Sequence, residues 1–187
     1  MENNELIRYE GGLVQHVGKA TRITNKLLAL GERQKIIDLF VCHPDFFRRL
    51  ISEFYHLDEN MIDNYVNQFN WRHLSKNLFI KWNEDLIDRY LTRWDWTMLS
   101  YNKKLPWTAE FITRYSEKWD QTSISRNDAL PWTEELVDKF AMIWDIREIS
   151  QNVAIPWTEG LIEKYEKKLF WIWFSHNRKL PWSDNLI

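Results

Sequence analysis

A 25-residue period constrains the fold of this chain more than any other feature. Leu-Pro-Trp-Thr begins at Leu105 and Leu130, Ile-Pro-Trp-Thr at Ile155, and Leu-Pro-Trp-Ser at Leu180. One period before Leu105, the stretch 80–83 keeps the tryptophan without the proline. A period of this length is typical of repeat arrays. We therefore predict tandem repeats over residues 57–187, with units 57–81, 82–106, 107–131, 132–156 and 157–181 and a partial unit 182–187.

Each repeat begins with a pattern that predicts an amphipathic helix. In the third copy the large apolar residues are Phe111, Ile112, Tyr115 and Trp119. Their spacing of i, i+1, i+4 and i+8 places them on one face of a helix. Thr108 stands at the N-cap position, where a hydroxyl oxygen accepts a backbone N–H. The pattern predicts one long helix whose apolar face is buried.

The recurring Pro-Trp pair then has a structural explanation. With Thr108 as N-cap, Trp107 precedes the cap and Ile112 is the fourth residue inside, which is the pairing of a hydrophobic staple. The proline before it favours an extended entry into the helix. We interpret this set as scaffold: Trp82, Pro106, Trp107, Pro131, Trp132, Pro156, Trp157, Pro181 and Trp182.

A second, shorter helix is predicted in the other half of each repeat. In the third copy Asp120 is its N-cap, Ile124 points inward, and the helix ends near Asn127. Asparagine tolerates the left-handed conformation that stops a helix. Ser125 recurs in every copy, which favours a backbone hydrogen bond over catalysis. The predicted fold is all-α, an α-solenoid with one long and one short helix in each repeat.

The N-terminal part does not follow the strict register. Residues 1–31 are predicted to form a helical cap, and residues 32–56 a degenerate capping repeat. The stretch from Tyr9 to Ala29 resembles a leader segment at the start of some bacterial proteins that carry different repeats downstream. That resemblance implies a portable docking or assembly element. A simple amphipathic capping helix is the alternative.

The array itself resembles tandem Trp-rich 25-residue repeats of bacterial and some viral proteins. Their pattern is Pro-Trp-Thr/Ser, then an acidic first turn, then Leu/Ile-Ser-x-Asn, and it covers residues 57–187. The resemblance implies a helical repeat fold and no particular activity. The fifth copy departs from the pattern with Gly160, Leu169 and Phe170, so we expect a distorted or fused helix pair there.

Composition excludes several classes of function. The formal net charge is −2, which gives no attraction to nucleic acid or anionic membranes. No apolar run is long enough to span a membrane, and no signal peptide is recognisable. The one cysteine, Cys42, indicates a reducing compartment, so we predict a cytoplasmic protein. The sequence contains no metal, cofactor or catalytic motif, and we predict a protein that is not an enzyme.

Binding is the better-supported function, because one part of the repeat varies between copies. The first turn of the second helix differs in every repeat, and repeat proteins carry recognition at such positions. Four tryptophans also occur here, outside the recurring positions. The candidate partner-binding residues are Trp71, Arg72, His73, Trp96, Thr97, Met98, Gln121, Ile146, Arg147, Trp171 and Trp173.

Three functions remain open at this point. A scaffold for protein–protein interaction or self-assembly fits a nearly neutral array, and the C-terminal repeat from residue 157 is expected to self-associate. Alternatively, exposed Trp71, Trp96 and Trp171 would bind carbohydrate or single-stranded nucleic acid by stacking. Burial of all three would exclude stacking. A basic groove would favour nucleic acid, and its residues would be Arg72, Lys76, Lys103, Lys104 and Arg126.

Overall fold

The computed structural model describes residues 41–181. The chain divides into two compact units, Met1–Leu50 and Ile51–Ile187. Within the first unit, the described residues include the exposed Cys42 and the start of helix α3 (Pro44–Phe54). The predictions made for residues 1–40 and 182–187, including Trp182, lie outside the described residues. The repeats from residue 57 onward belong to the second unit.

The described part of the chain is all helical, with two helices in each 25-residue repeat and no strand between residues 41 and 181. The first helices of the repeats are α4 (Glu59–Asn64), α6 (Glu84–Arg89), α8 (Ala109–Arg114), α10 (Glu134–Lys139) and α12 (Glu159–Tyr165). The second helices are α5 (Trp71–Ser75), α7 (Trp96–Tyr101), α9 (Gln121–Arg126), α11 (Ile146–Gln151) and α13 (Trp171–Phe174).

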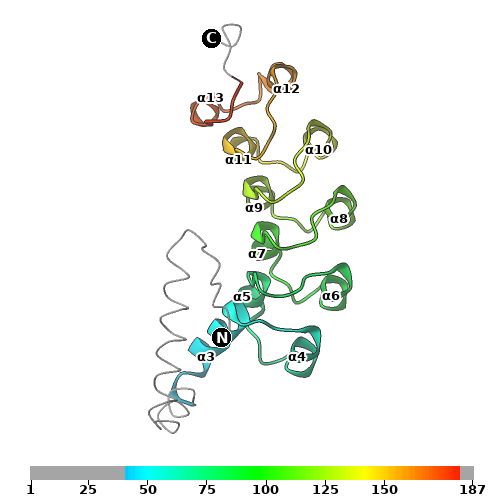
Figure 1. Ribbon diagram of the computed structural model, residues 1–187, viewed down its shortest axis with the longest axis vertical. Coiled ribbons are helices and arrows are strands. Elements are labelled where there is room, and N and C mark those ends of the chain that lie inside the picture. Colours follow the sequence, from blue (N-terminus) through cyan, green and yellow to red (C-terminus); the bar gives the residue numbers. More distant parts are fainter. Residues whose placement is uncertain (1–40, 182–187) are drawn as a thin grey trace, which may run out of the picture. The chain divides into compact units, whose positions relative to one another are not determined.

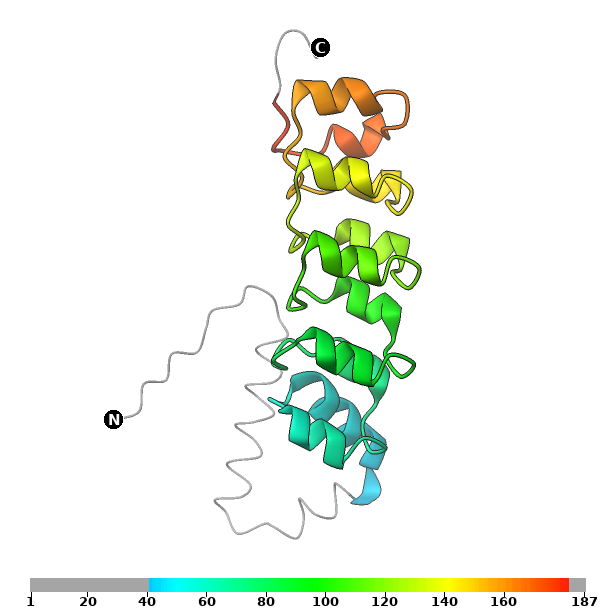
Figure 2. The ribbon, with the colours of Figure 1, turned by 90° about the vertical axis from the view of Figure 1, so that its right-hand side faces the viewer.

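Within the second unit the helices form two columns. The first-helix column comprises α4, α6, α8, α10 and α12, and Figure 2 looks onto it. In the second-helix column each helix contacts the next, from α5 through α7, α9 and α11 to α13. Figure 1 shows residues 57–181 bent into an arc, with the second-helix column on its concave side.

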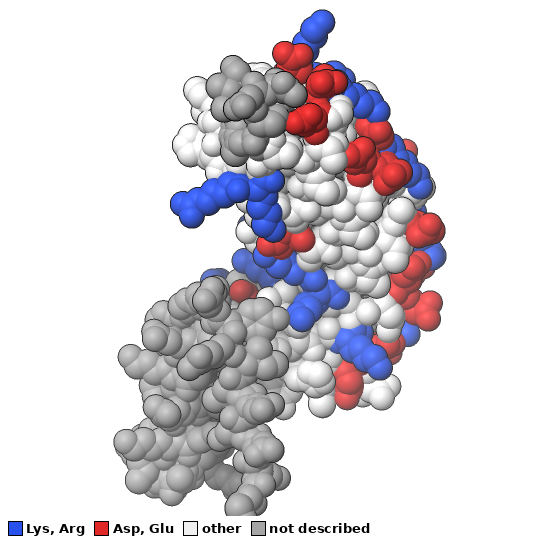
Figure 3. All heavy atoms as spheres, turned by 45° about the horizontal axis from the view of Figure 1, so that its top comes forward, with Lys and Arg blue, Asp and Glu red and all other residues white. Residues whose placement is uncertain are grey.

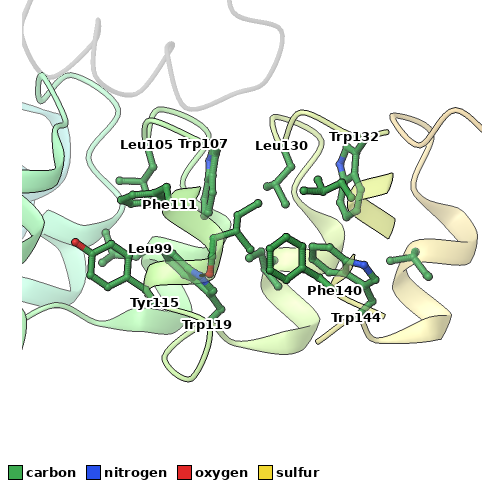
Figure 4. Close-up of a cluster of buried hydrophobic side chains, with 14 of the residues drawn as sticks. Leu99, Leu105, Trp107, Phe111, Tyr115, Trp119, Leu130, Trp132, Phe140 and Trp144 are labelled. Atoms are coloured by element: carbon green, nitrogen blue, oxygen red, sulfur yellow. Dashed lines mark hydrogen bonds between the residues drawn. The ribbon is translucent and has the colours of Figure 1, made fainter. Parts of the chain in front are cut away.

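The predicted apolar stripe is buried between the two columns. Phe111, Ile112 and Ile124 are fully buried in the third repeat, and the equivalent residues of the neighbouring repeats are buried with them. Figure 4 shows Trp107 beside Phe111 and Trp119, with ring centroids 5.7 and 5.0 Å away. The aromatic residues therefore build one continuous core along the array.

The predicted helix starts are confirmed. Thr108 Oγ1 accepts the backbone N–H of Phe111 at 3.0 Å, and Asp95 accepts that of Met98 at 3.1 Å. Such caps satisfy one of the N–H groups that a helix leaves without a partner at its start. The other described repeats use the equivalent residue in the same way, except before α13, where Phe170 has no oxygen to offer.

The prediction of one long and one short helix is wrong. Helix α8 ends at Arg114 and has 6 residues, as many as α9. The residue after it, Tyr115, is no longer in a helical conformation, with φ −115° and ψ 26°. The Trp119 indole then donates to the Ile112 carbonyl at 3.0 Å, and Trp94 and Trp144 repeat this bond. Because the indole provides a donor for that carbonyl, the helix ends early with its backbone satisfied.

The recurring asparagine also acts differently from the prediction. Asn102 has φ −74° and ψ 118°, which is extended backbone rather than the left-handed conformation. Its amide donates to the carbonyls of Ser75 and Asn77 in the preceding repeat, at 2.9 and 3.1 Å, and its oxygen accepts the N–H of Lys104. Asn127 makes the equivalent bonds one repeat later. The asparagine therefore links repeats as well as ending a helix.

The prediction that the serine makes a backbone hydrogen bond is confirmed. Ser100 Oγ donates to the Trp96 carbonyl at 2.6 Å and accepts the backbone N–H of Asp120 at 2.9 Å. Asp120 is the N-cap of the second helix in the next repeat. The hydroxyl therefore connects two successive second helices, which the sequence had not indicated.

The expected distortion of the fifth repeat is present, without fusion of its helices. Helix α12 has 7 residues and α13 only 4. No helix in the described part of the chain is long and apolar enough to cross a membrane.

Candidate functional site

The recurring tryptophans belong to the scaffold. Trp82, Trp107 and Trp132 are buried, and each indole donates to the carbonyl of the asparagine five residues earlier, at 2.9 Å. Trp157 is buried as well, but its indole nitrogen has no hydrogen-bond partner. The preceding prolines, Pro106, Pro131 and Pro156, are each the central residue of a three-residue turn, in which the tryptophan N–H donates to the carbonyl of the residue before the proline at 2.8–2.9 Å. The predicted extended entry is thus a tight turn, and Pro181 lies at the end of the described residues.

Trp71 and Trp96, both proposed as partner-binding residues, pack between repeats. Both are half-buried. The ring of Trp71 lies 4.9 Å from that of Tyr90 and 4.7 Å from that of Trp94, both in the next repeat. Trp96 has the equivalent neighbours in the third repeat. Their indole nitrogens donate to the carbonyls of Val66 and Leu91, so neither ring is a fully open stacking surface.

The tryptophans at the first position of the second helices, Trp71, Trp96 and Trp171, would form a ladder along the array if every repeat had one, but this ladder is interrupted. The equivalent positions in the third and fourth repeats hold Gln121, which is exposed, and Ile146, which packs against the core. Among the described tryptophans, Trp171 and Trp173 of the fifth repeat are the exposed ones, at 45% and 46%, and they flank Ile172 at 72%. Burial of all three ladder tryptophans would have excluded stacking, and the structure instead leaves one of them open.

The first turns of the second helices divide into inward and outward positions. In the first four repeats the third residue is buried or half-buried: His73 Nδ1 lies 2.5 Å from a carboxylate oxygen of Glu53, and Met98 is half-buried. The middle residue is exposed in four repeats, as Arg72, Thr97, Arg147 and Ile172, and Thr122 is half-buried. The middle position is therefore the one that reaches solvent in most of the repeats.

The residue four positions after each middle residue shares its helical face, because i and i+4 are neighbours on a helix. The two rows together form a surface on the concave side of the arc, and most of its residues are exposed. We call this surface the second-helix face, and it consists of Arg72, Lys76, Thr97, Tyr101, Thr122, Arg126, Arg147, Gln151, Ile172 and His176.

The charge on the second-helix face is one-sided. Four of its ten residues are arginine or lysine, and none is aspartate or glutamate. Figure 3 shows Lys and Arg gathered on the concave side of the described unit, whereas Asp and Glu alternate with basic residues along the opposite edge. The two rows therefore have an excess of positive charge, and the acids Asp95, Glu148 and Asp145 lie beside three of their four cations.

The residues of the predicted basic groove are partly neutralised. Arg126 forms a bidentate pair with Glu148 at 2.6 and 2.7 Å, and this pair raises the pKa of the Arg126 guanidinium. Lys103 lies 2.7 Å from Asp128. Arg72 is 3.9 Å from Asp95, a distance at which the guanidinium is still largely solvated.

Two residues of the predicted groove keep their charge available. Lys76 and Lys104 have no ion-pair partner within 4.0 Å among residues 41–181. Of these two lysines, Lys76 belongs to the second-helix face, on the same helix as Arg72, and Lys104 follows α7 outside the face.

The first-helix column has a different electrostatic pattern. Arg114 pairs with Glu84 at 2.8 Å and with Asp88, and Lys164 pairs with Asp138 at 2.6 Å. The Lys164 ammonium and the Tyr165 hydroxyl lower the pKa of the Asp138 carboxyl. Acids and bases thus pair across repeats on this side. On the second-helix face, Arg72, Arg126 and Arg147 also have an acid within 4.0 Å, and Lys76 has none among residues 41–181.

No metal-binding cluster is present in the described part of the chain. Among residues 41–181, no three His, Cys, Asp or Glu side chains are placed to hold a metal ion. Comparisons of the chain with protein-family models, with curated proteins and with solved structures return no match.

Seven of the ten residues of the second-helix face were not among the predicted partner-binding residues: Lys76, Tyr101, Thr122, Arg126, Gln151, Ile172 and His176. Lys76 and Arg126 had been predicted only for a basic groove. The signal that would have found five of the seven is the i+4 spacing from the middle residue of each triplet.

Proposed function

We propose that residues 57–181 form an α-solenoid that binds a protein partner through its second-helix face and is not an enzyme. The stacking of every second helix on the next supports the solenoid. The fixed tryptophan, asparagine and serine positions support a relationship to the Trp-rich 25-residue repeat proteins that the sequence resembles. A reducing, cytoplasmic location remains part of the proposal.

One observation carries the proposed binding function. Within each second helix the buried positions keep their character, as Leu74, Leu99 and Ile124 do, while the middle residue ranges from basic to polar to apolar along the array. The five middle residues are Arg72, Thr97, Thr122, Arg147 and Ile172. Stacking alone requires only the buried set. A surface that varies on a rigid frame is the arrangement by which repeat proteins bind their partners.

Binding of carbohydrate or single-stranded nucleic acid is the weaker candidate. Trp71 and Trp96 contribute their rings to packing between repeats, which leaves Trp171 and Trp173 as exposed aromatic surfaces. Two neighbouring rings at one end of the array do not make the ladder that stacking along a strand or a glycan chain requires.

Self-assembly is retained as a form of the same function. Phe170, Trp171, Ile172 and Trp173 are four successive exposed apolar residues, and such a patch marks an association site in a soluble protein. Sedimentation at increasing concentration would detect a dimer, and replacement of Ile172 and Trp173 by serine should abolish it.

Quantitative affinity capture tests the proposed face. The full chain is compared with an Arg72→Ala, Tyr101→Ala, Arg147→Ala variant and with a control, Asp85→Ala, Glu117→Ala, Lys167→Ala, whose residues are exposed on the first-helix side. Partners retained by the wild-type chain should also be retained by the control and should be lost from the face variant. Equal retention by all three proteins would reject the second-helix face as the binding site.

A further inference from the structure

The charge of the second-helix face narrows the kind of partner it fits. Arg72, Lys76 and Arg147 reach solvent from this face, and no carboxylate shares its two rows. The nearest acids are the N-cap residues Asp95 and Asp145, at 3.9 Å from Arg72 and 3.6 Å from Arg147. Side chains of Arg72 and Arg147 are 64% and 61% exposed, so these cations remain available to a ligand.

The face also changes in character along its length. It has basic side chains on α5, α9 and α11, neutral Thr97 and Tyr101 on α7, and the exposed Ile172 on α13. Trp173 lies beside Ile172 and extends the apolar end. A ligand that covers the whole face must therefore combine several negative charges along its length with an apolar side chain at the α13 end.

The length of the face sets the length of such a ligand. Packed helices lie about 8–10 Å apart, so the four steps from α5 to α13 extend over about 32–40 Å. An extended peptide rises about 3.3 Å per residue, and roughly 10–12 residues would cover that distance.

We propose that the second-helix face binds an extended acidic peptide segment of a partner protein, with its carboxylates on Arg72, Lys76 and Arg147 and an apolar residue on Ile172 and Trp173. This inference rests on the proposed function and specifies its partner. Charge complementarity carries it, because the four cations of the face outnumber the three acids within 4.0 Å of them, and this excess attracts an acidic ligand and disfavours a basic one.

Nucleic acid fits the same face poorly. A single strand carries one phosphate on every nucleotide, whereas the face has four basic residues in ten, and Arg126 is already paired with Glu148. The acid-rich first-helix column adds repulsion for a long polyanion. A short acidic segment needs only the few cations that the face provides.

Selection from a library of random dodecapeptides displayed on phage tests the proposal. The full wild-type chain should enrich peptides that contain more Asp and Glu than the unselected library. Synthetic copies should bind in fluorescence polarisation and should bind the Arg72→Glu, Lys76→Glu, Arg147→Glu variant about tenfold more weakly or worse. A control with the same change of charge, Lys139→Glu, Lys167→Glu, Lys168→Glu, should bind as the wild type does. Circular dichroism establishes that all three proteins are folded.

The outcomes separate this inference from the proposed function. If the selected peptides are not enriched in Asp and Glu but fail to bind the Arg72→Glu, Lys76→Glu, Arg147→Glu variant, the acidic ligand is rejected. The second-helix face would then remain the binding site. Peptides that bind all variants equally would overturn both. Tighter binding of a labelled twelve-nucleotide thymidine strand than of any selected peptide would assign the face to nucleic acid instead.

Discussion

The first-helix column contains two kinds of contact between neighbouring repeats. Between α6 and α8, Asp88 accepts the Tyr115 hydroxyl at 2.7 Å and pairs with Arg114. Between α8 and α10, the equivalent positions hold Thr113 and Phe140, which have neither the carboxylate nor the hydroxyl. The interface between α10 and α12 returns to the first kind, with Asp138 and Tyr165 at 2.8 Å.

The difference shows that the acid and the tyrosine hydroxyl occur together. Tyr115 is 4% exposed and Phe140 is 6% exposed, so both rings are buried to the same extent. A hydroxyl at that depth without an acceptor would leave a polar group unsatisfied, which costs more than the bond itself contributes. Between α8 and α10, where Thr113 holds the position of the acid, the ring of Phe140 is therefore the better neighbour, because it has no hydroxyl that needs an acceptor.

Removal of the acid at the paired interface should have the largest effect. Asp88→Ala leaves the buried Tyr115 hydroxyl without its acceptor, and we expect the free energy of unfolding to fall by about 1–3 kcal/mol. Thr113→Ala, at the unpaired interface, should change it by less than about 0.5 kcal/mol. Urea denaturation measures both, and equal losses would contradict the distinction between the two interfaces.

Introducing the acid–tyrosine pair between α8 and α10 should raise the free energy of unfolding, by less than the loss of Asp88 lowers it. Phe140→Tyr alone should destabilise the protein, whereas Thr113→Asp together with Phe140→Tyr should stabilise it by about 1 kcal/mol relative to the wild type. A double-mutant cycle isolates the coupling energy of the new pair. Additive single effects would mean that the two positions do not interact.

The smallest predicted difference in stability, between the wild type and a tyrosine variant, appears at alkaline pH. Burial, followed by the hydrogen bond to Asp138, raises the pKa of Tyr165 from 10.0 to about 12. Since the folded state holds this proton more tightly, the unfolded state loses it first, and stability should fall as pH rises from 10 towards 12. The Tyr165→Phe variant should lose less stability over that range in urea denaturation. An identical pH dependence in both proteins would exclude a role for this proton.

The parts of the fold that depend on local sequence were the ones that could be predicted. Apolar spacing identified the buried residues Phe111 and Ile112, and residue type identified the cap Thr108. Such signals involve residues within a few positions of one another. They determine the existence and the start of each helix.

Longer-range hydrogen bonds determined what the sequence did not reveal. The helix length depends on a bond from Trp119 to a carbonyl 7 residues earlier, and the role of Asn102 depends on carbonyls 25 and 27 residues earlier. At the candidate site, Trp71 was predicted to bind a partner. Its ring instead packs against Tyr90 and Trp94, and the prediction was wrong because both of these residues lie in the next repeat. Spacing within one repeat contains no information about such neighbours.

The direction of the asparagine bonds gives the array a polarity. Asn102 and Asn127 both donate to carbonyls of the repeat before them, never to the repeat after. During synthesis the N-terminal repeats leave the ribosome first, so each new asparagine meets acceptors that are already in place. Each repeat therefore presents to the next one the backbone acceptors that its asparagine requires, so the two ends of the array are not equivalent.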